Sequence, residues 1–146
     1  MDGIGKDVWV RVGIQQGQIY NFSPEDEVDN HYYVVLNKNP KSDTELYLAM
    51  FTTQKDHARK LIELRRLGSN TLVEVKNGEC SFLPRSLDSV INCNFVLRIS
   101  IDDLILRIEQ SNGTVRYPTL EEGFMNRVKE GILASRLISP VIKLSL

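Results

Sequence analysis

One histidine and two threonines have side chains suited to chemistry on a phosphate at neutral pH. His31 precedes the apolar run 32–36, and Thr52 and Thr53 close the alternating run that starts at residue 46. A histidine has an ordinary pKa near ~6.5, so it can accept or donate a proton at neutral pH. A threonine hydroxyl can bind a phosphate together with backbone N–H groups at the start of a helix. If the two runs form a hairpin, these three side chains lie at the same end of it.

Each of the three also has a structural explanation, which the sequence leaves open. A histidine at the start of a strand is commonly half-exposed and bonded to a carbonyl, with no part in catalysis. Thr53 with Asp56 three residues later resembles a capping box, so its hydroxyl could serve only to start the next helix. We therefore predict a helix that begins at residue 53 and has Gly68 as its C-cap.

That predicted helix has one basic face. Apolar residues at 58, 61, 62 and 64 form the stripe that would pack on the core. The opposite face would either hold RNA phosphates or, as is usual for such surfaces, remain solvated. Lys38, Lys41 and Arg85 stand in predicted loops that could lie near it, although the sequence does not fix their positions. The face itself consists of Lys55, Arg59, Lys60, Arg65 and Arg66.

The first two thirds of the chain have mostly the patterns of strands. The runs 32–36 and 46–51 are apolar on both faces, which predicts strands covered on both sides. The polar segment between them predicts a loop. Asn77-Gly78 predicts a tight hairpin turn between its two flanking runs. Besides the central pair, we predict a strand or extended arm at 8–12 and strands at 18–22, 71–75, 80–83 and 89–96.

The last third has helical patterns. We predict one helix at 100–109, capped by Ser100, and another at 119–139, capped by Thr119, with an edge strand at 142–146. The whole chain, 1–146, is then one α+β domain, with a small barrel or curled sheet, one inserted helix and two C-terminal helices. One stripe of the second helix exceeds what one small core needs, which predicts a homodimer; it consists of Phe124, Val128 and Ile132.

The composition excludes several classes of function. The net charge of −1 gives no overall attraction to nucleic acid, so any RNA binding needs a local patch. No apolar run approaches the ~20 residues that span a membrane. The first residues form no apolar signal core, so we expect a cytoplasmic protein. Cys80 and Cys93 are then most simply buried thiols. With two histidines, no glycine-rich phosphate loop and no nucleophile elbow, we expect neither a metal site nor a cofactor.

Several short stretches together resemble a known family. Gly17-Gln18-Ile19-Tyr20, the run 31–37 (HYYVVLN), the run 51–53 (FTT) and the run 86–93 (SLDSVINC) look like the PemK/MazF-like toxins of bacterial toxin–antitoxin systems. The resemblance covers about residues 17–96. It implies an SH3-like β-barrel that forms a homodimer, cleaves single-stranded RNA without a metal and is inhibited by a cognate antitoxin protein.

The chain departs from this family at the start of its second strand. Members usually have Arg-Pro there, with a catalytic arginine, whereas this chain has His31-Tyr32. Either His31 replaces the arginine, or the activity has changed or been lost. Alternatives are a non-catalytic SH3-like module that binds a protein or RNA, and an enzyme of another class. For the ribonuclease, we predict His31 and Thr53 as catalytic and the following as RNA-binding: Lys38, Thr52, Lys55, Arg59, Lys60 and Arg85.

Overall fold

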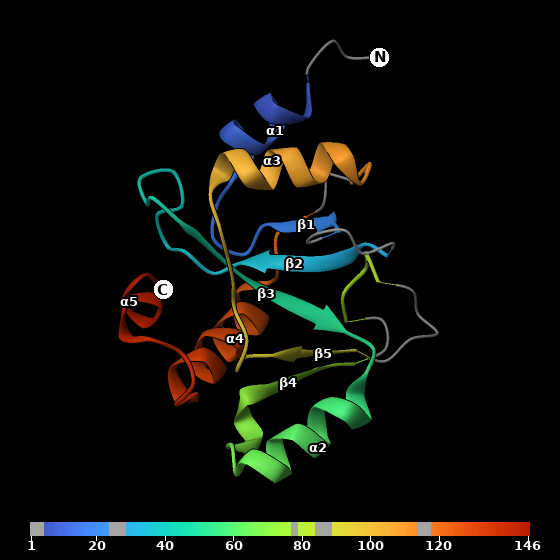
Figure 1. Ribbon diagram of the computed structural model, residues 1–146, viewed down its shortest axis with the longest axis vertical. Coiled ribbons are helices and arrows are strands. Elements are labelled where there is room, and N and C mark those ends of the chain that lie inside the picture. Colours follow the sequence, from blue (N-terminus) through green and yellow to red (C-terminus); the bar gives the residue numbers. More distant parts are fainter. Residues whose placement is uncertain (1–4, 24–28, 77–78, 84–88, 114–117) are drawn as a thin grey trace.

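The chain forms an open antiparallel sheet with helices on both faces (Figure 1). The computed structural model describes residues 5–23, 29–76, 79–83, 89–113 and 118–146. The strands are β1 (Ile19–Phe22), β2 (His31–Val35), β3 (Leu46–Thr52), β4 (Leu72–Val75), β5 (Ser89–Asn92) and β6 (Leu97–Ile99). The helices are α1 (Lys6–Gly13), α2 (Lys55–Arg65), α3 (Ile101–Gln110), α4 (Glu122–Ala134) and α5 (Pro140–Leu144), with a 3₁₀ turn, η1 (Ser69–Thr71).

The strand order is β1-β2-β3-β5-β4, and β6 pairs with the first part of β3. The α+β class, the central hairpin and the helix inserted after it are confirmed. In the described part of the chain β1 pairs with β2 and β4 with β5, and no ladder joins β1 to β4. The sheet is therefore open there and does not close into a barrel.

One face of the sheet, which we call the α3 face, is covered by α1 and α3. Strand residues alternate between faces, so β2 sends Tyr33 and Val35 to this side. Phe22 stacks on Tyr33 with ring centroids 4.4 Å apart. Figure 1 shows α1 and α3 side by side above β1 and β2. The buried cluster here consists of Val10, Ile14, Tyr20, Phe22, Tyr33, Val35, Leu46, Leu48, Leu104, Ile105 and Ile108.

The other face, the α4 face, is covered by α4 and α5 and reaches across five strands. Residues from β1 through β5 join one cluster there, so this core connects the hairpin to the β4–β5 pair. The predicted dimer stripe on α4 lies inside this core, with Val128 and Ile132 fully buried, so it cannot serve as a dimer surface. The central members are Ile19, Val34, Ala49, Phe51, Val73, Ile91, Phe124, Val128, Ile132 and Ile142.

Both predicted terminal strands are wrong, because each is a helix. Val10 in α1 and Ile14, the C-cap four residues later, are both buried, while Val12 is exposed. At the other end Pro140 occupies the first helical turn of α5, a position where its missing N–H costs nothing. Ile142 is buried there and Leu144 is exposed, which breaks the predicted alternation.

The hairpin predicted from 71–75 and 80–83 is also wrong. Residues 80–83 form a turn, with Leu83 N–H donating to the Cys80 carbonyl at 3.1 Å. β4 pairs instead with β5, and Val73 lies opposite Ile91. Of the segment predicted as one strand at 89–96, only residues 89–92 form a strand, β5, and the next strand, β6, begins at Leu97. Asn77-Gly78 lies outside the described residues.

Of the three predicted N-caps, one is correct. Ser100 Oγ accepts from Asp103 N–H at 3.1 Å and starts α3 as expected. The N-caps of α2 and α4 are Gln54 and Glu121, neither with a side-chain cap, so the predicted caps Thr53 and Thr119 are wrong. Arg66, with a left-handed φ of 53°, ends α2 in place of the predicted Gly68. No helix in the described ranges is long and apolar enough to cross a membrane.

Candidate functional site

The predicted catalytic residues come from the end of the central hairpin where β2 begins and β3 ends. His31 is two residues before Tyr33, and Thr52 two residues after Met50, so both side chains are on the α3 face. Extending the observed pairing of Tyr33 with Met50 would place His31 opposite Thr52. The two strands share this end and this face.

At this end the two strands diverge. Their ladder stops at Tyr33 and Met50, and beyond it β3 pairs with β5, with Thr52 opposite Val90. Figure 1 shows the start of β2 and the end of β3 moving apart. On the α4 face the ring of Phe82 contacts a ring from each strand. The ring centroids are 5.3 Å apart for Tyr32 on β2 and 5.5 Å apart for Phe51 on β3. Aromatic side chains therefore fill the space between the diverging strands on the α4 face, and space remains on the α3 face.

A small pocket, which we call the hairpin-end pocket, opens beside Thr52 on the α3 face. It encloses about 150 Å³. Its walls are largely apolar, and Phe95 at its edge is 56% exposed. Apolar walls with a few convergent polar groups are typical of small-ligand sites, and an exposed ring suits stacking of a nucleobase. The lining residues are Met50, Thr52, Gln54, His57, Ala58, Leu61, Asn92 and Phe95.

The two threonines differ in their surroundings. Thr52 is half-buried, lines the pocket, and its Oγ1 accepts from Gln54 N–H at 3.1 Å. Thr53 is exposed in the connection from β3 to α2 and does not line the pocket. The geometry thus favours Thr52 as the hydroxyl closest to a ligand in the pocket. Thr53 stays a prediction.

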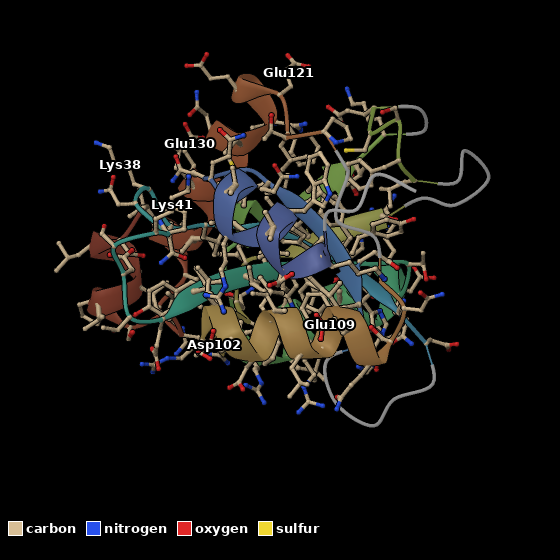
Figure 2. All side chains as sticks on the ribbon, turned by 90° about the horizontal axis from the view of Figure 1, so that it is seen from above. Lys38, Lys41, Asp102, Glu109, Glu121 and Glu130 are labelled. Carbon is tan, nitrogen blue, oxygen red and sulfur yellow. The ribbon has the colours of Figure 1, made fainter. Side chains whose placement is uncertain are left out.

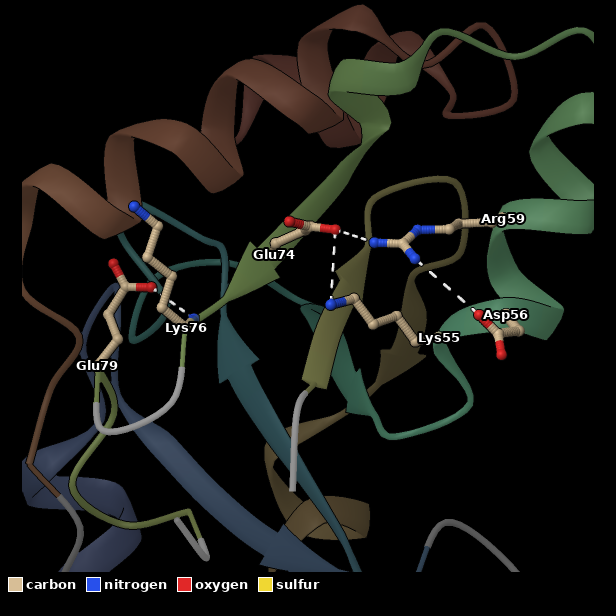
Figure 3. A network of polar contacts seen from close by, with 6 residues as sticks. All are labelled: Lys55, Asp56, Arg59, Glu74, Lys76 and Glu79. Carbon is tan, nitrogen blue, oxygen red and sulfur yellow. Dashed lines mark hydrogen bonds and ion pairs between the residues drawn. The ribbon is translucent and has the colours of Figure 1, made fainter. Parts of the chain in front are cut away.

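The predicted basic face of α2 is partly neutralised. Glu74 on β4 accepts a hydrogen bond from Arg59, and its Oε1 is 3.7 Å from Lys55 Nζ (Figure 3). The hydrogen bond from Arg59, together with the charge of Lys55, lowers the pKa of Glu74 below its ordinary value. Lys60, Arg65 and Arg66 remain exposed on the helix. A phosphate would have to compete with Glu74 for the first two cations.

Lys38, another predicted RNA-binding residue, is not brought to this end. Lys38 is in the loop that joins the far ends of β2 and β3, roughly 20 Å along the strand from His31 at ~3.3 Å per residue. Figure 2 shows Lys38 and Lys41 together on this loop, where Lys41 Nζ donates to the Val12 carbonyl at 2.8 Å. Arg85 lies outside the described residues.

The thiols do not belong to the site. Both cysteines are buried, as predicted. Burial raises the pKa of the Cys80 thiol to about 11 and that of Cys93 to about 12. A thiol with so high a pKa is protonated at neutral pH and is a poor nucleophile. No group of three or more His, Cys, Asp or Glu side chains suited to a metal ion occurs in the described part of the chain.

Sequence reasoning missed His57, Asn92 and Phe95, which complete the pocket. His57 carries a usable signal, because it is the second histidine and lies in the first turn of the helix after Thr52. Asn92 and Phe95 carry none, since they approach Thr52 only through the pairing of β3 with β5. No protein-family model matches this chain, and a search of curated proteins also finds no match.

Proposed function

We propose that this protein is an endoribonuclease that cleaves single-stranded RNA at the hairpin end without a metal. The observation that supports it best is the pocket with an exposed aromatic edge that Thr52 lines, at the end of the hairpin where His31 begins β2. The resemblance of residues 17–96 to PemK/MazF-like toxins adds to this. On the same basis we propose a cytoplasmic toxin with an SH3-like barrel opened at one side, a homodimeric assembly and inhibition by a cognate antitoxin.

The proposed reaction uses the 2′-hydroxyl of the substrate as nucleophile. The 2′-oxygen bonds to phosphorus as the bond to the 5′-oxygen breaks, which gives a 2′,3′-cyclic phosphate and a 5′-hydroxyl end. One imidazole takes the 2′-hydroxyl proton and another group donates a proton to the leaving oxygen. His57 lines the pocket with Thr52, and His31 begins β2, the strand next to the one that Thr52 ends. Thr52 and Thr53 hydroxyls and Lys55 would stabilise the charge on the phosphate.

The test is cleavage of a fluorophore–quencher RNA of mixed sequence in the presence of EDTA, beside a DNA of the same sequence. We expect cleavage of the RNA alone, because DNA lacks the 2′-hydroxyl. His31→Ala should reduce the rate by ~10²-fold or more, the usual share of a general acid or base. Thr52→Val should reduce it more than Thr53→Val, because only Thr52 lines the pocket. Thermal melts of each variant show whether it remains folded.

A matched control is Lys41→Ala, which removes a cation from the far end of the hairpin and should leave the rate unchanged. Full activity of a folded His31→Ala protein would remove this histidine from the mechanism. The second candidate function is a non-catalytic module that binds RNA or protein, favoured by the engagement of Lys55 and Arg59 with Glu74. Absence of cleavage by the wild-type protein on any mixed RNA would favour that candidate over the ribonuclease.

A further inference from the structure

A second cavity, which we call the edge groove, runs along the outer strand of the sheet. It encloses about 650 Å³ and is bounded by α2, η1, β4 and α4. Val73 and Glu74 both line it although adjacent strand residues point to opposite faces, so the groove follows the edge of β4. Figure 3 shows β4 lying between α4 and α2. The two helices are the walls of a channel along a strand edge.

The backbone of β4 has unused hydrogen-bonding groups along this groove. Cys93 N–H donates to the Thr71 carbonyl at 2.8 Å, so in the antiparallel ladder residues 71, 73 and 75 bond to β5. Leu72 and Glu74 therefore direct their backbone groups away from β5. Leu72 N–H is taken by the Ser69 carbonyl. Among the described residues, that leaves the Leu72 carbonyl and both backbone groups of Glu74 without a partner along the edge.

The edge is closed beyond Glu74 by a side chain. Lys76 N–H donates to Glu79 Oε1 at 3.0 Å (Figure 3). Leu72 N–H is also occupied. The part of the β4 edge that can pair with another strand is therefore short and centred on Glu74. A guest strand whose residue pairs with Glu74 would exchange two hydrogen bonds with it and donate a third to the Leu72 carbonyl. Open strand edges are the sites at which proteins accept an extended peptide.

Charge is distributed unevenly along the groove. Near Glu74, Arg59 bonds to Glu74 itself, and Arg127 is 2.6 Å from Glu79, so these cations already have partners. One helical turn further toward η1 are Glu63 on α2 and Glu130 on α4. Neither makes an ion pair with any described residue. The η1 end of the groove thus carries one carboxylate on each wall.

We propose that the edge groove binds an extended dibasic segment of another protein, which adds as a strand to β4. Adjacent residues of a strand point to opposite faces, so two consecutive basic residues would reach Glu63 and Glu130 at once. Its backbone would pair with Glu74 and Leu72. The proposal is independent of the ribonuclease, which uses the hairpin end.

The first test measures binding of a fluorescein-labelled peptide, TVTVKRTVT, by fluorescence anisotropy. A peptide with EE in place of KR should bind at least ~10-fold more weakly. Glu63→Gln with Glu130→Gln should weaken binding of the KR peptide by ~10-fold or more, with each single change giving part of the loss. Glu109→Gln is the matched control, because it removes the same charge from α3, away from Glu130 (Figure 2). Equal binding of both peptides would overturn the proposal.

The second test separates strand addition from simple charge attraction. N-methylation of alternate peptide residues removes the N–H groups that face β4 in one set and only outward N–H groups in the other set. We expect N-methylation of the set that faces β4 to abolish binding, and N-methylation of the outward set to leave the Kd within about twofold. Equal effects of the two sets would overturn the strand pairing. His31→Ala should bind the KR peptide as the wild type does, so loss of RNA cleavage and loss of peptide binding are distinguishable.

Discussion

α3 and α2 are on the same face of the sheet, but they are held there by different interactions. α3 buries Leu104, Ile105 and Ile108 against the hairpin and is capped by Ser100. α2 buries Ala58 and Ile62, has no side-chain cap, and is tied to β4 through ion pairs to Glu74. One helix is part of a core, whereas the other lies on the margin of the sheet.

The difference shows where this fold can accommodate a ligand. Both cavities described above border α2, and neither borders α3. The apolar cover of the α3 face ends near Met50, and the hairpin-end pocket begins at that residue. Elements that bind ligands are commonly drawn from the less stable parts of a structure. We therefore expect amide hydrogen exchange to be faster in α2 than in α3.

The largest expected effect on stability concerns Gly113, which follows α3 and lies close to the backbone of β1. A Cβ on Gly113 would be 2.0 Å from the backbone oxygen of Asn21 in β1, so backbone must move. Gly113→Ala should lower the free energy of unfolding by about 3 kcal/mol or more, measured by urea denaturation. Gly13→Ala is the control, because a Cβ there meets nothing within 4 Å. Equal stability of the two variants would mean that the close contact between Gly113 and Asn21 does not hold α3 in place.

The next comparison truncates one isoleucine in each helix. Ile108 is fully buried in α3, and its change to Ala should cost roughly 3–5 kcal/mol. Ile62 in α2 borders the open edge groove, where solvent can fill the space left behind. Ile62→Ala should cost about 2 kcal/mol or less, below the usual range for a closed core. Urea denaturation of both variants measures this, and a larger loss at Ile62 would reverse the comparison.

A smaller effect is expected at the two helix starts. Ser100→Ala removes the hydroxyl that accepts from Asp103 N–H and should cost about 1 kcal/mol. Gln54→Ala changes an N-cap whose side chain makes no capping bond, so the free energy of unfolding should change by only a few tenths of a kcal/mol. If thermal denaturation shows the same loss for both, α2 depends on its first turn as much as α3 does.

The sequence predicted the elements whose signals are local. The central hairpin was predictable because both strands are apolar on both faces, and α3 because Ser100 marks its start. α1 was mistaken for a strand because Val8, Val10 and Val12 alternate as strand residues do. Val10 and Ile14 are buried in the same cluster as residues of α3, and this contact between distant segments favours the helical spacing over the alternating one.

The remainder depends on contacts between distant segments. β4 pairs with β5 and not with the nearer residues 80–83, so a local turn signal was misleading. The hairpin-end pocket needs Phe95, which is 43 residues after Thr52 in the sequence. Glu74 was predictable as an outward residue between two buried valines, but its choice of Arg59 and Lys55 was not.

The smallest expected effect concerns the ion pairs that tie α2 to Glu74. Arg59 and Lys55 lower the pKa of this carboxyl below its ordinary value of 4.5. A depressed pKa stabilises the fold above the unfolded pKa, and this contribution is lost as the pH falls through the folded pKa. The Glu74 side chain is 52% exposed, so water screens the pairs. Glu74→Gln should therefore lower the free energy of unfolding by less than ~1 kcal/mol at pH 7.

The pH and salt dependence of that difference separates charge from packing. Urea denaturation of the wild type and of Glu74→Gln should give a difference in the free energy of unfolding that is present at pH 7 and shrinks as the pH falls through the lowered pKa of Glu74. At pH 7, about 0.5 M NaCl should reduce it, because exposed charges are screened. A difference that stays constant as the pH falls would show that Glu74 supports α2 through packing, and α2 and α3 would then differ only in how much they pack.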